Sequence, residues 1–233
     1  MLITILQATQ EGVDVITDGE SVEKSLSIIE LISSGGTAGK LIIGILFILL
    51  IVAIYIYFER LLAIKAASKV DSNFMNQIKD HVSNGKIDSA QVLCAQVNSP
   101  VSRLIAKGIT RIGKPLEDIN TAIETAGRLE VYGLEKNVSM LATISSVAPM
   151  IGFLGTVIGM ILSIFEIANS GGQIDIKMLA DGLYTAMTTT VAGLIVGIVA
   201  YMAYNHLVVK TDKVVYQMEA NSVEFLDHLN EPV

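Results

Sequence analysis

Three long stretches of this 233-residue chain contain no Asp, Glu, Lys or Arg. They run from Leu41 to Phe58, from Asn137 to Phe165 and from Gly182 to Val209, and they are 18, 29 and 28 residues long. About 20 apolar residues in a helix span the ~30 Å hydrocarbon core of a membrane. Each stretch is therefore predicted to form a transmembrane helix.

The composition agrees with an all-α integral membrane protein. Hydrophobic residues make up 52% of the chain, and the mean hydropathy is +0.58. At about 1.5 Å per residue, the second and third stretches each reach roughly 40 Å. They are expected to tilt or to project beyond the bilayer. We predict three transmembrane helices, with long helices extending into a cytoplasmic helical bundle.

The distribution of basic residues predicts the orientation. The segment 59–139 carries 11 of the 16 Lys and Arg residues. The positive-inside rule places this segment and the C-terminal tail in the cytoplasm, with the N-terminus and the loop near 169–177 facing outward. The segment also carries nine Asp and Glu residues. It is therefore close to neutral, and nothing in its charge indicates nucleic-acid binding.

These boundaries give a predicted division of the whole chain. An outward-facing N-terminus with an amphipathic helix (1–38) is followed by transmembrane helix 1 (39–58), a cytoplasmic helical segment (59–136), transmembrane helix 2 (137–168), an outward loop (169–178), transmembrane helix 3 (179–209) and a cytoplasmic C-terminal helix (210–233).

Local patterns refine the ends of these segments. Val22, Leu26 and Ile29 have the spacing of a short amphipathic helix on the outer membrane face, although a plain N-terminal extension is the alternative. The N-terminus lacks the basic region of a cleaved signal, so we expect it to be retained. No strong break separates Leu116–Lys136 from span two, which predicts one long helix entering the membrane. Helical spacing in 210–229 predicts that span three also continues into the cytoplasm.

The reactive side chains do not form a recognisable chemical site. The single cysteine, Cys94, cannot form a disulfide within the chain, and we interpret it as a small buried thiol. His81, His206 and His228 have no partners at metal-ligand spacing. We expect no metal, no cofactor and no enzymatic activity, because no nucleophile with a base and no pair of acids lies in or near the spans.

Small residues recur at helical spacing in spans two and three. Such spacing lets two helix backbones approach closely, and van der Waals contact then replaces the hydrophobic drive that is absent in lipid. Many membrane helices pack in this way, so packing is the first interpretation for each position. The glycines concerned are Gly152, Gly155, Gly159, Gly193 and Gly197.

Threonines accompany the glycines. Thr156 lies in span two, and Thr188, Thr189 and Thr190 are consecutive in span three. A threonine hydroxyl can bond back to its own helix, so it requires no other partner. Consecutive helical residues nevertheless point about 100° apart, so at least one of the three should face a neighbouring helix or a lumen. No charged residue lies deep in any span, so a titrating proton carrier must come from another chain.

The sequence resembles the ExbB/TolQ/MotA proton-channel family over roughly residues 38–210. The residues that carry the resemblance are Leu134-Glu135-Lys136-Asn137, Leu141-Ala142-Thr143-Ile144, the segment Ala148–Met160 and Thr189-Thr190-Val191-Ala192-Gly193-Leu194. The segment Ala148–Met160 and Tyr204-Asn205 are closest to ExbB. MotA has four spans, which argues against it, and TolQ remains an alternative.

This resemblance implies a homopentamer in the bacterial inner membrane. Spans two and three would line a central pore that holds a dimer of an ExbD-like single-span protein. In the family, a membrane aspartate of that partner carries the proton, and ion flow turns the pentamer to energise a TonB-like protein. Thr156 and Thr190 would be the pore threonines, with Thr189 and Thr185 on the same pathway. Apart from the resemblance, we interpret Arg60, Arg128 and Lys136 at the cytoplasmic border first as ordinary anchors to membrane lipids of the inner leaflet, with binding of acidic lipid or partner tails as the alternative.

One residue departs from the family pattern, and two other functions stay open. Many relatives have a glutamate five residues before the second pore threonine, where this chain has Thr185. That glutamate therefore cannot be the universal proton carrier. The alternatives are a TolQ-like motor subunit for envelope maintenance and a membrane scaffold that conducts nothing. Sodium remains open as the coupling ion.

Overall fold

The computed structural model describes residues 37–69, 73–169 and 176–230. These residues form seven helices, and no strand occurs among them. The helices are α3 (Thr37–Ala67), α4 (Phe74–Ser83), α5 (Ile87–Val97), α6 (Pro100–Ile109), α7 (Leu116–Glu135), α8 (Val138–Asn169) and α9 (Ile176–Asn230). The predicted amphipathic helix near the N-terminus, and most of the predicted outward loop, lie outside the described residues.

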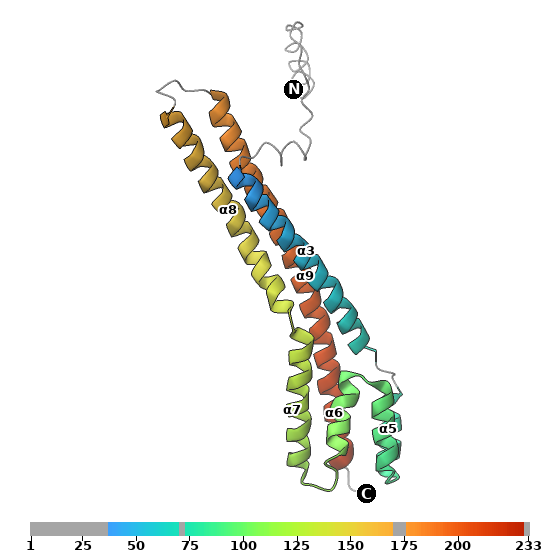
Figure 1. Ribbon diagram of the computed structural model, residues 1–233. Helices are drawn as coiled ribbons and strands as arrows, with labels where there is room; N and C mark the ends of the chain where they lie inside the picture. The colour runs from blue at the N-terminus through green and yellow to red at the C-terminus, as the bar shows by residue number, and fades with distance from the viewer. Residues whose placement is uncertain (1–36, 70–72, 170–175, 231–233) are drawn as a thin grey trace, which may run out of the picture.

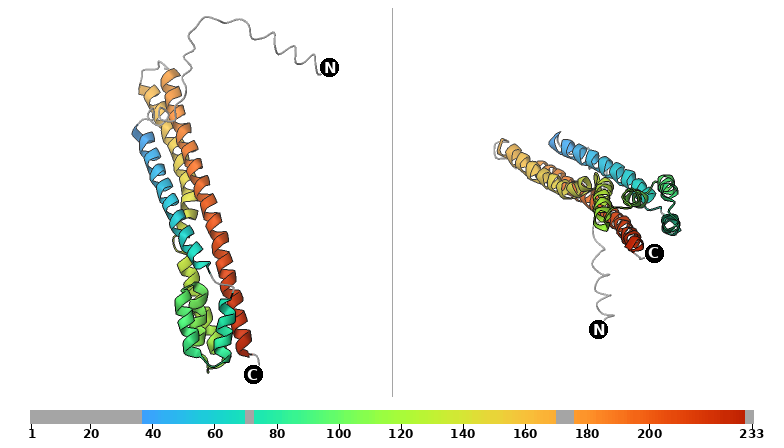
Figure 2. Two further views of the ribbon diagram at one scale, coloured as in Figure 1. Left: turned by 90° about the vertical axis from the view of Figure 1, so that its right-hand side faces the viewer. Right: turned by 90° about the horizontal axis from the view of Figure 1, so that it is seen from below.

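The molecule is elongated, with two structurally different ends (Figures 1 and 2). At one end α3, α8 and the first half of α9 lie side by side. At the other end the shorter helices gather around the second half of α9, close to the C-terminus. The stretches Ala38–Ala67, Val138–Asn169 and Gly182–Asn230 are long and apolar enough to cross a membrane. This confirms the predicted all-α membrane fold with three spans.

Helix α9 joins the two ends without interruption. It contains 55 residues, which at about 1.5 Å each is roughly 80 Å, well over twice the hydrocarbon thickness. The prediction that the third span continues as a helix beyond Val209 is confirmed. Past that point Val214, Met218 and Phe225 are buried. The second half of α9 is therefore part of the core of the bundle.

The prediction of one unbroken helix from Leu116 into span two is wrong. Helix α7 ends at Glu135 and α8 begins at Val138. Between them Lys136 is extended, with φ −50° and ψ 130°, and Asn137 has a left-handed φ of 63°. Asparagine tolerates this conformation better than most residues. The break allows the chain to change direction as it leaves the bundle.

The bundle has its own apolar core. Pro100 is the first residue of α6, and Ser99 caps the start of this helix. The Ser102 backbone N–H donates to Ser99 Oγ at 3.1 Å, and the Ser99 backbone N–H donates to Ser102 Oγ at 2.8 Å. Proline and serine are favoured at these positions. Gly108 lies against both Ile123 of α7 and Phe225 of α9, with a built Cβ 2.8 Å from each side chain. Cys94 is buried in α5, and burial raises the pKa of its thiol to about 11.

Candidate functional site

Helices α8 and α9 run antiparallel and meet along a seam of small residues. A Cβ built on any of the seam glycines would contact the opposite helix within 3 Å. The facing pairs follow one another regularly down the two helices. They are Ser163 with Gly182, Gly159 with Ala186, Gly155 with Thr189, Gly152 with Gly193, and Pro149 with Gly197.

The two glycines at the centre of the seam face backbone rather than side chains. A Cβ on Gly193 would lie 2.6 Å from the carbonyl oxygen of Ala148, and one on Gly152 would lie 2.8 Å from the carbonyl oxygen of Thr189. Backbone cannot move aside as a flexible side chain can. Only glycine allows the two helices to approach this closely, which is the van der Waals contact that membrane helices depend on.

Two threonine hydroxyls of α9 donate hydrogen bonds across the seam to the same carbonyl oxygen of α8. Thr189 is fully buried, and its Oγ1 donates to the Ala186 carbonyl oxygen at 2.7 Å and to that of Gly152 at 3.3 Å. Thr190 is half-buried, and its Oγ1 donates to the same Gly152 oxygen at 3.1 Å. In an α-helix this oxygen also accepts the N–H of Thr156. The Gly152 carbonyl therefore links both pore threonine candidates.

Thr156 and Thr190 share one face of the α8–α9 pair. Thr156 follows Gly155 and Thr190 follows Thr189, and Gly155 and Thr189 face each other in the seam. One step along either helix turns the side chain by about 100°, and in an antiparallel pair both steps turn toward the same side. The two residues therefore lie at the same level. The Thr156 hydroxyl donates to the Phe153 carbonyl oxygen of its own helix at 2.6 Å.

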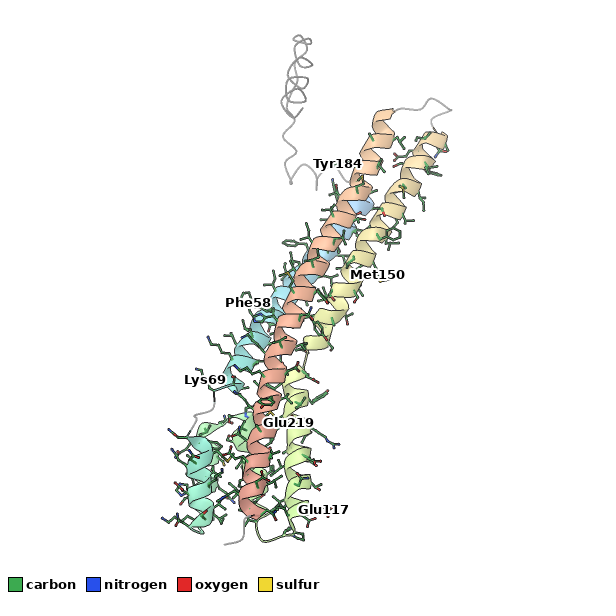
Figure 3. All side chains as sticks on the ribbon, turned by 180° about the vertical axis from the view of Figure 1, so that it is seen from behind. Phe58, Lys69, Glu117, Met150, Tyr184 and Glu219 are labelled. Carbon is green, nitrogen blue, oxygen red and sulfur yellow. The ribbon has the colours of Figure 1, made fainter. Side chains whose placement is uncertain are left out.

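Helix α3 covers the other side of the pair. Thr185 is turned toward it, since a Cβ on Gly39 would lie 2.8 Å from Thr185 Cγ2. Seen from behind, α8 and α9 lie in front and α3 passes behind α9 (Figure 3). Of the four threonines singled out from the sequence, the structure thus brings two to one open face. Thr189 is sealed in the seam and Thr185 faces α3.

Exposed apolar side chains lie next to these hydroxyls on the open face. Phe153 on α8 is 66% exposed, and Met187 and Leu194 on α9 are also exposed. Spans 137–165 and 182–209 hold no Asp, Glu, Lys or Arg. In this chain the face therefore offers hydrogen-bonding groups and an apolar surround, but no carboxylate that could take up a proton.

Sequence reasoning missed one polar contact between the spans. The Tyr57 hydroxyl on α3 lies 2.8 Å from Nδ1 of His206 on α9. These residues are 149 positions apart, so spacing along the chain carried no sign of the contact. The signal that could have found it is the placement of both residues near the same end of an apolar span.

Known proteins match this chain over much of its length. Residues 96–220 match the MotA/TolQ/ExbB proton channel family. The chain is 31% identical over 210 residues to the Tol-Pal system protein TolQ of Haemophilus influenzae, which covers 81% of this chain and 87% of that protein. It is 26% identical over 194 residues to a biopolymer transport protein ExbB homolog of Methanothermobacter thermautotrophicus, with coverages of 83% and 67%.

A shorter match at higher identity involves ExbB of Helicobacter pylori, at 42% identity over 79 residues, 34% of this chain and 54% of that protein. The family match contains α7, α8 and most of α9, and so includes the whole seam with Thr156 and Thr190. Members of this family are proton-channel motor subunits and not enzymes. The extent of the match, together with the three-span fold, shows that the chain belongs to the MotA/TolQ/ExbB proton channel family.

Proposed function

We propose that this chain is the ExbB-like subunit of an ion-driven motor, in which the face carrying Thr156 and Thr190 lines the proton pathway. The observation that carries the proposal is the shared position of these two hydroxyls, at one level and on the side away from α3. Five copies arranged around an axis would form one band of ten hydroxyls.

A band of hydroxyls suits a carboxyl group that gains and loses a proton inside a membrane. Threonine Oγ1 can donate to an ionised carboxylate and can accept from a protonated one. Burying an unpaired charge in an apolar medium is costly, and hydrogen bonds to the charge reduce that cost. Because spans two and three of this chain lack a carboxylate, the proton carrier would be an aspartate of an ExbD-like single-span partner. A dimer of that partner would occupy the pore.

The seam gives each subunit a rigid two-helix wall. Gly152 and Gly193 hold α8 and α9 in backbone contact, and Thr189 ties them within the seam. We place Thr189 and Thr185 behind the lining threonines, as supports of the proton pathway. In relatives with a glutamate at the position of Thr185, an acid would face α3, and the motor of this chain would operate without it.

The proposed setting is the bacterial inner membrane, with the N-terminus in the periplasm and the C-terminus in the cytoplasm. The concentration of Lys and Arg in 59–139 supports this orientation. Ion flow would turn the pentamer relative to the partner and energise a TonB-like protein that serves transport across the outer membrane.

A TolQ-like role is the second candidate. It is favoured by the match to TolQ of Haemophilus influenzae, which covers more of both proteins than the match to ExbB of Helicobacter pylori. Co-purification separates the two roles. The chain would be expressed with tagged ExbD-like and TolR-like proteins from the same genome, and the protein retained after solubilisation would identify the partner.

Proton flux tests the channel itself. The chain would be reconstituted in liposomes with and without its co-encoded single-span partner, and flux would be followed with a pH-sensitive dye. Loss of a hydrogen bond to a charged group costs about 1.5–3 kcal/mol, so Thr156→Val and Thr190→Val should each lower partner-dependent flux by roughly tenfold or more.

Thr188→Val is the matched control. The Thr188 hydroxyl donates to the Tyr184 carbonyl oxygen of its own helix at 2.9 Å, and its side chain points away from the shared face of Thr156 and Thr190. Partner-dependent flux through the Thr188→Val variant should match that of the unchanged protein. Equal flux in all three variants would place the pathway elsewhere. Partner binding without flux in the unchanged protein would favour the scaffold.

A further inference from the structure

A second feature of the membrane end lies away from the seam, between α3 and α9. A groove of about 510 Å³ opens there beside the Tyr57–His206 contact. Its walls are mainly apolar and include Ile54 and Phe58 on α3 and Val199 and Met202 on α9. Phe58 is 57% exposed and is labelled on α3 in Figure 3. The volume and apolar lining of the groove suit a hydrocarbon chain.

Lysines follow the groove on both of the helices that form its walls. On α3, Ile54, Phe58 and Lys65 lie on one helix face, since they are spaced i, i+4 and i+11. On α9, His206, Lys210 and Lys213 follow the same rule at i, i+4 and i+7. Helices α3 and α9 run in the same direction, because Gly39 is level with Thr185 and Tyr57 is level with His206. The lysines therefore follow the groove on the side nearest the bundle.

The distances suit a lipid headgroup. Lys65 and Lys213 lie about two turns beyond Tyr57 and His206, roughly 11 Å along the helix axes, and Lys210 lies about one turn beyond. Side chains on a helix lean toward its N-terminus, which here is back toward the groove. Long lysine side chains can also lie along apolar surface while the ammonium group reaches the membrane interface. Three ammonium groups can thus converge beside the mouth of the groove.

The positive charge at this mouth is not neutralised by the described residues around it. Lys65, Lys210 and Lys213 are exposed and form no ion pair within the described ranges. Two described acids that are close to these lysines in the sequence belong to other contacts. Glu59 is paired with Arg60 at 2.6 Å, and Asp212 lines a separate pocket with Tyr204, on the side of α9 away from the groove.

We propose that the groove between α3 and α9 binds one anionic phospholipid. An acyl chain lies against Ile54, Phe58 and Met202, and the phosphate is held by Lys65, Lys210 and Lys213. The Tyr57 hydroxyl and His206 meet the ester region between them. Basic residues beside transmembrane helices attract acidic headgroups with about 1 kcal/mol per residue. The site requires only the membrane fold, and depends on neither the proposed partner nor ion flow.

The test counts lipid bound to the purified full-length chain. Phosphatidylglycerol or phosphatidylcholine is titrated into the protein in detergent, and bound lipids per chain are counted by native mass spectrometry. We expect tighter binding of phosphatidylglycerol. Replacing Lys65, Lys210 and Lys213 together by glutamine should weaken its binding by well over tenfold, since each lysine contributes roughly fivefold. Replacing the same three by arginine should keep it.

A triple variant in the bundle controls for net charge. Lys86, Lys107 and Lys114 replaced by glutamine change the charge equally and lie far from the groove, so binding should be unchanged. Two results would overturn the proposal: equal binding by the groove and bundle variants, or equal affinity of the unchanged protein for the two lipids. Proton flux does not enter this readout, so a failed channel proposal would leave the result interpretable.

Discussion

The Arg60 side chain on α3 donates from Nη1 to the carbonyl oxygen of Gly133, 3.3 Å away, in the last turn of α7. The same guanidinium donates from Nη2 to Glu59 Oε1 at 2.6 Å, and Arg60 is only 8% exposed. Carbonyl groups in the last turn of a helix lack partners within the helix, and a cation there also complements the helix dipole. Arg60 thus holds the first span against the end of α7, beside the break before α8.

Replacing Arg60 by methionine should destabilise the chain. The variant loses the part-buried bond from the guanidinium to Gly133, and a hydrogen bond that involves a charged group contributes about 1.5–3 kcal/mol. Thermal unfolding of the purified protein measures the loss. Arg128→Met is the control, because the Arg128–Glu124 pair is exposed and spans 3.8 Å, and exposed pairs contribute little. Equal melting temperatures for the two variants would contradict the role given to Arg60.

Gly193→Ala should separate α8 from α9. The new Cβ would lie 2.6 Å from the Ala148 carbonyl oxygen, and overpacking of this kind costs roughly 1–3 kcal/mol. Gly44→Ala is the matched control, because a Cβ at Gly44 meets nothing within 4 Å. Alanine is the better helix former by about 1 kcal/mol. We therefore expect opposite shifts in melting temperature, and shifts of the same sign would argue against a tight seam.

Asn137→Val should strain the break between α7 and α8. Asn137 has φ 63°, a conformation that costs most L-residues roughly 1–2 kcal/mol and a β-branched residue more. Asn137→Gly should be tolerated, because glycine adopts this φ freely. Urea unfolding of both variants gives the comparison. Retention of full stability by the valine variant would mean that the break does not require a left-handed residue.

The buried thiol of Cys94 should make the free energy of unfolding depend on pH. Burial raises the pKa of its thiol from 9.0 to about 11. Between these values the unfolded chain loses the proton while the folded chain keeps it, so this stabilisation is complete below pH 9 and is lost as the pH rises toward 11. The loss amounts to about 2–3 kcal/mol.

Cys94→Ala isolates this effect from the titration of lysines and tyrosines. The stability difference between the unchanged protein and the variant would be measured at pH 8 and at pH 10.5. We expect it to shrink at the higher pH, and a constant difference would refute the shifted pKa. Because the thiolate is the reactive form, Cys94 should also react slowly with maleimide at pH 8 until the chain is unfolded.

Much of the fold could be predicted because lipid constrains sequence strongly. A span must be apolar over its full length, so the absence of charge in 41–58, 137–165 and 182–209 was sufficient to locate three helices. The break at Lys136–Asn137 was missed for the opposite reason. It depends on the backbone angles of two residues, and neither proline nor glycine marks it.

The residues of the candidate site could be predicted from the sequence, but the direction in which each side chain faces could not. Thr185, Thr189 and Thr190 have the same chemistry in sequence. Their roles separate only when α3 and α8 are placed around α9, because 100° of helix rotation decides whether a hydroxyl faces α3, the seam or the open side. The Tyr57–His206 contact likewise depends on the packing of helices far apart in the chain.

The continuity of α9 has a mechanical consequence. From Ile198 to Asn230 this helix contains neither glycine nor proline, and its far end is fixed in the bundle by the buried Phe225. About 60 Å of unbroken helix separates Thr190 from Asn230. Helices α7 and α8 lack such a connection, because Asn137 interrupts them. Helix α9 is therefore the stiff connection between the membrane end and the bundle in each subunit. A force applied near Thr190 would reach the bundle chiefly through α9.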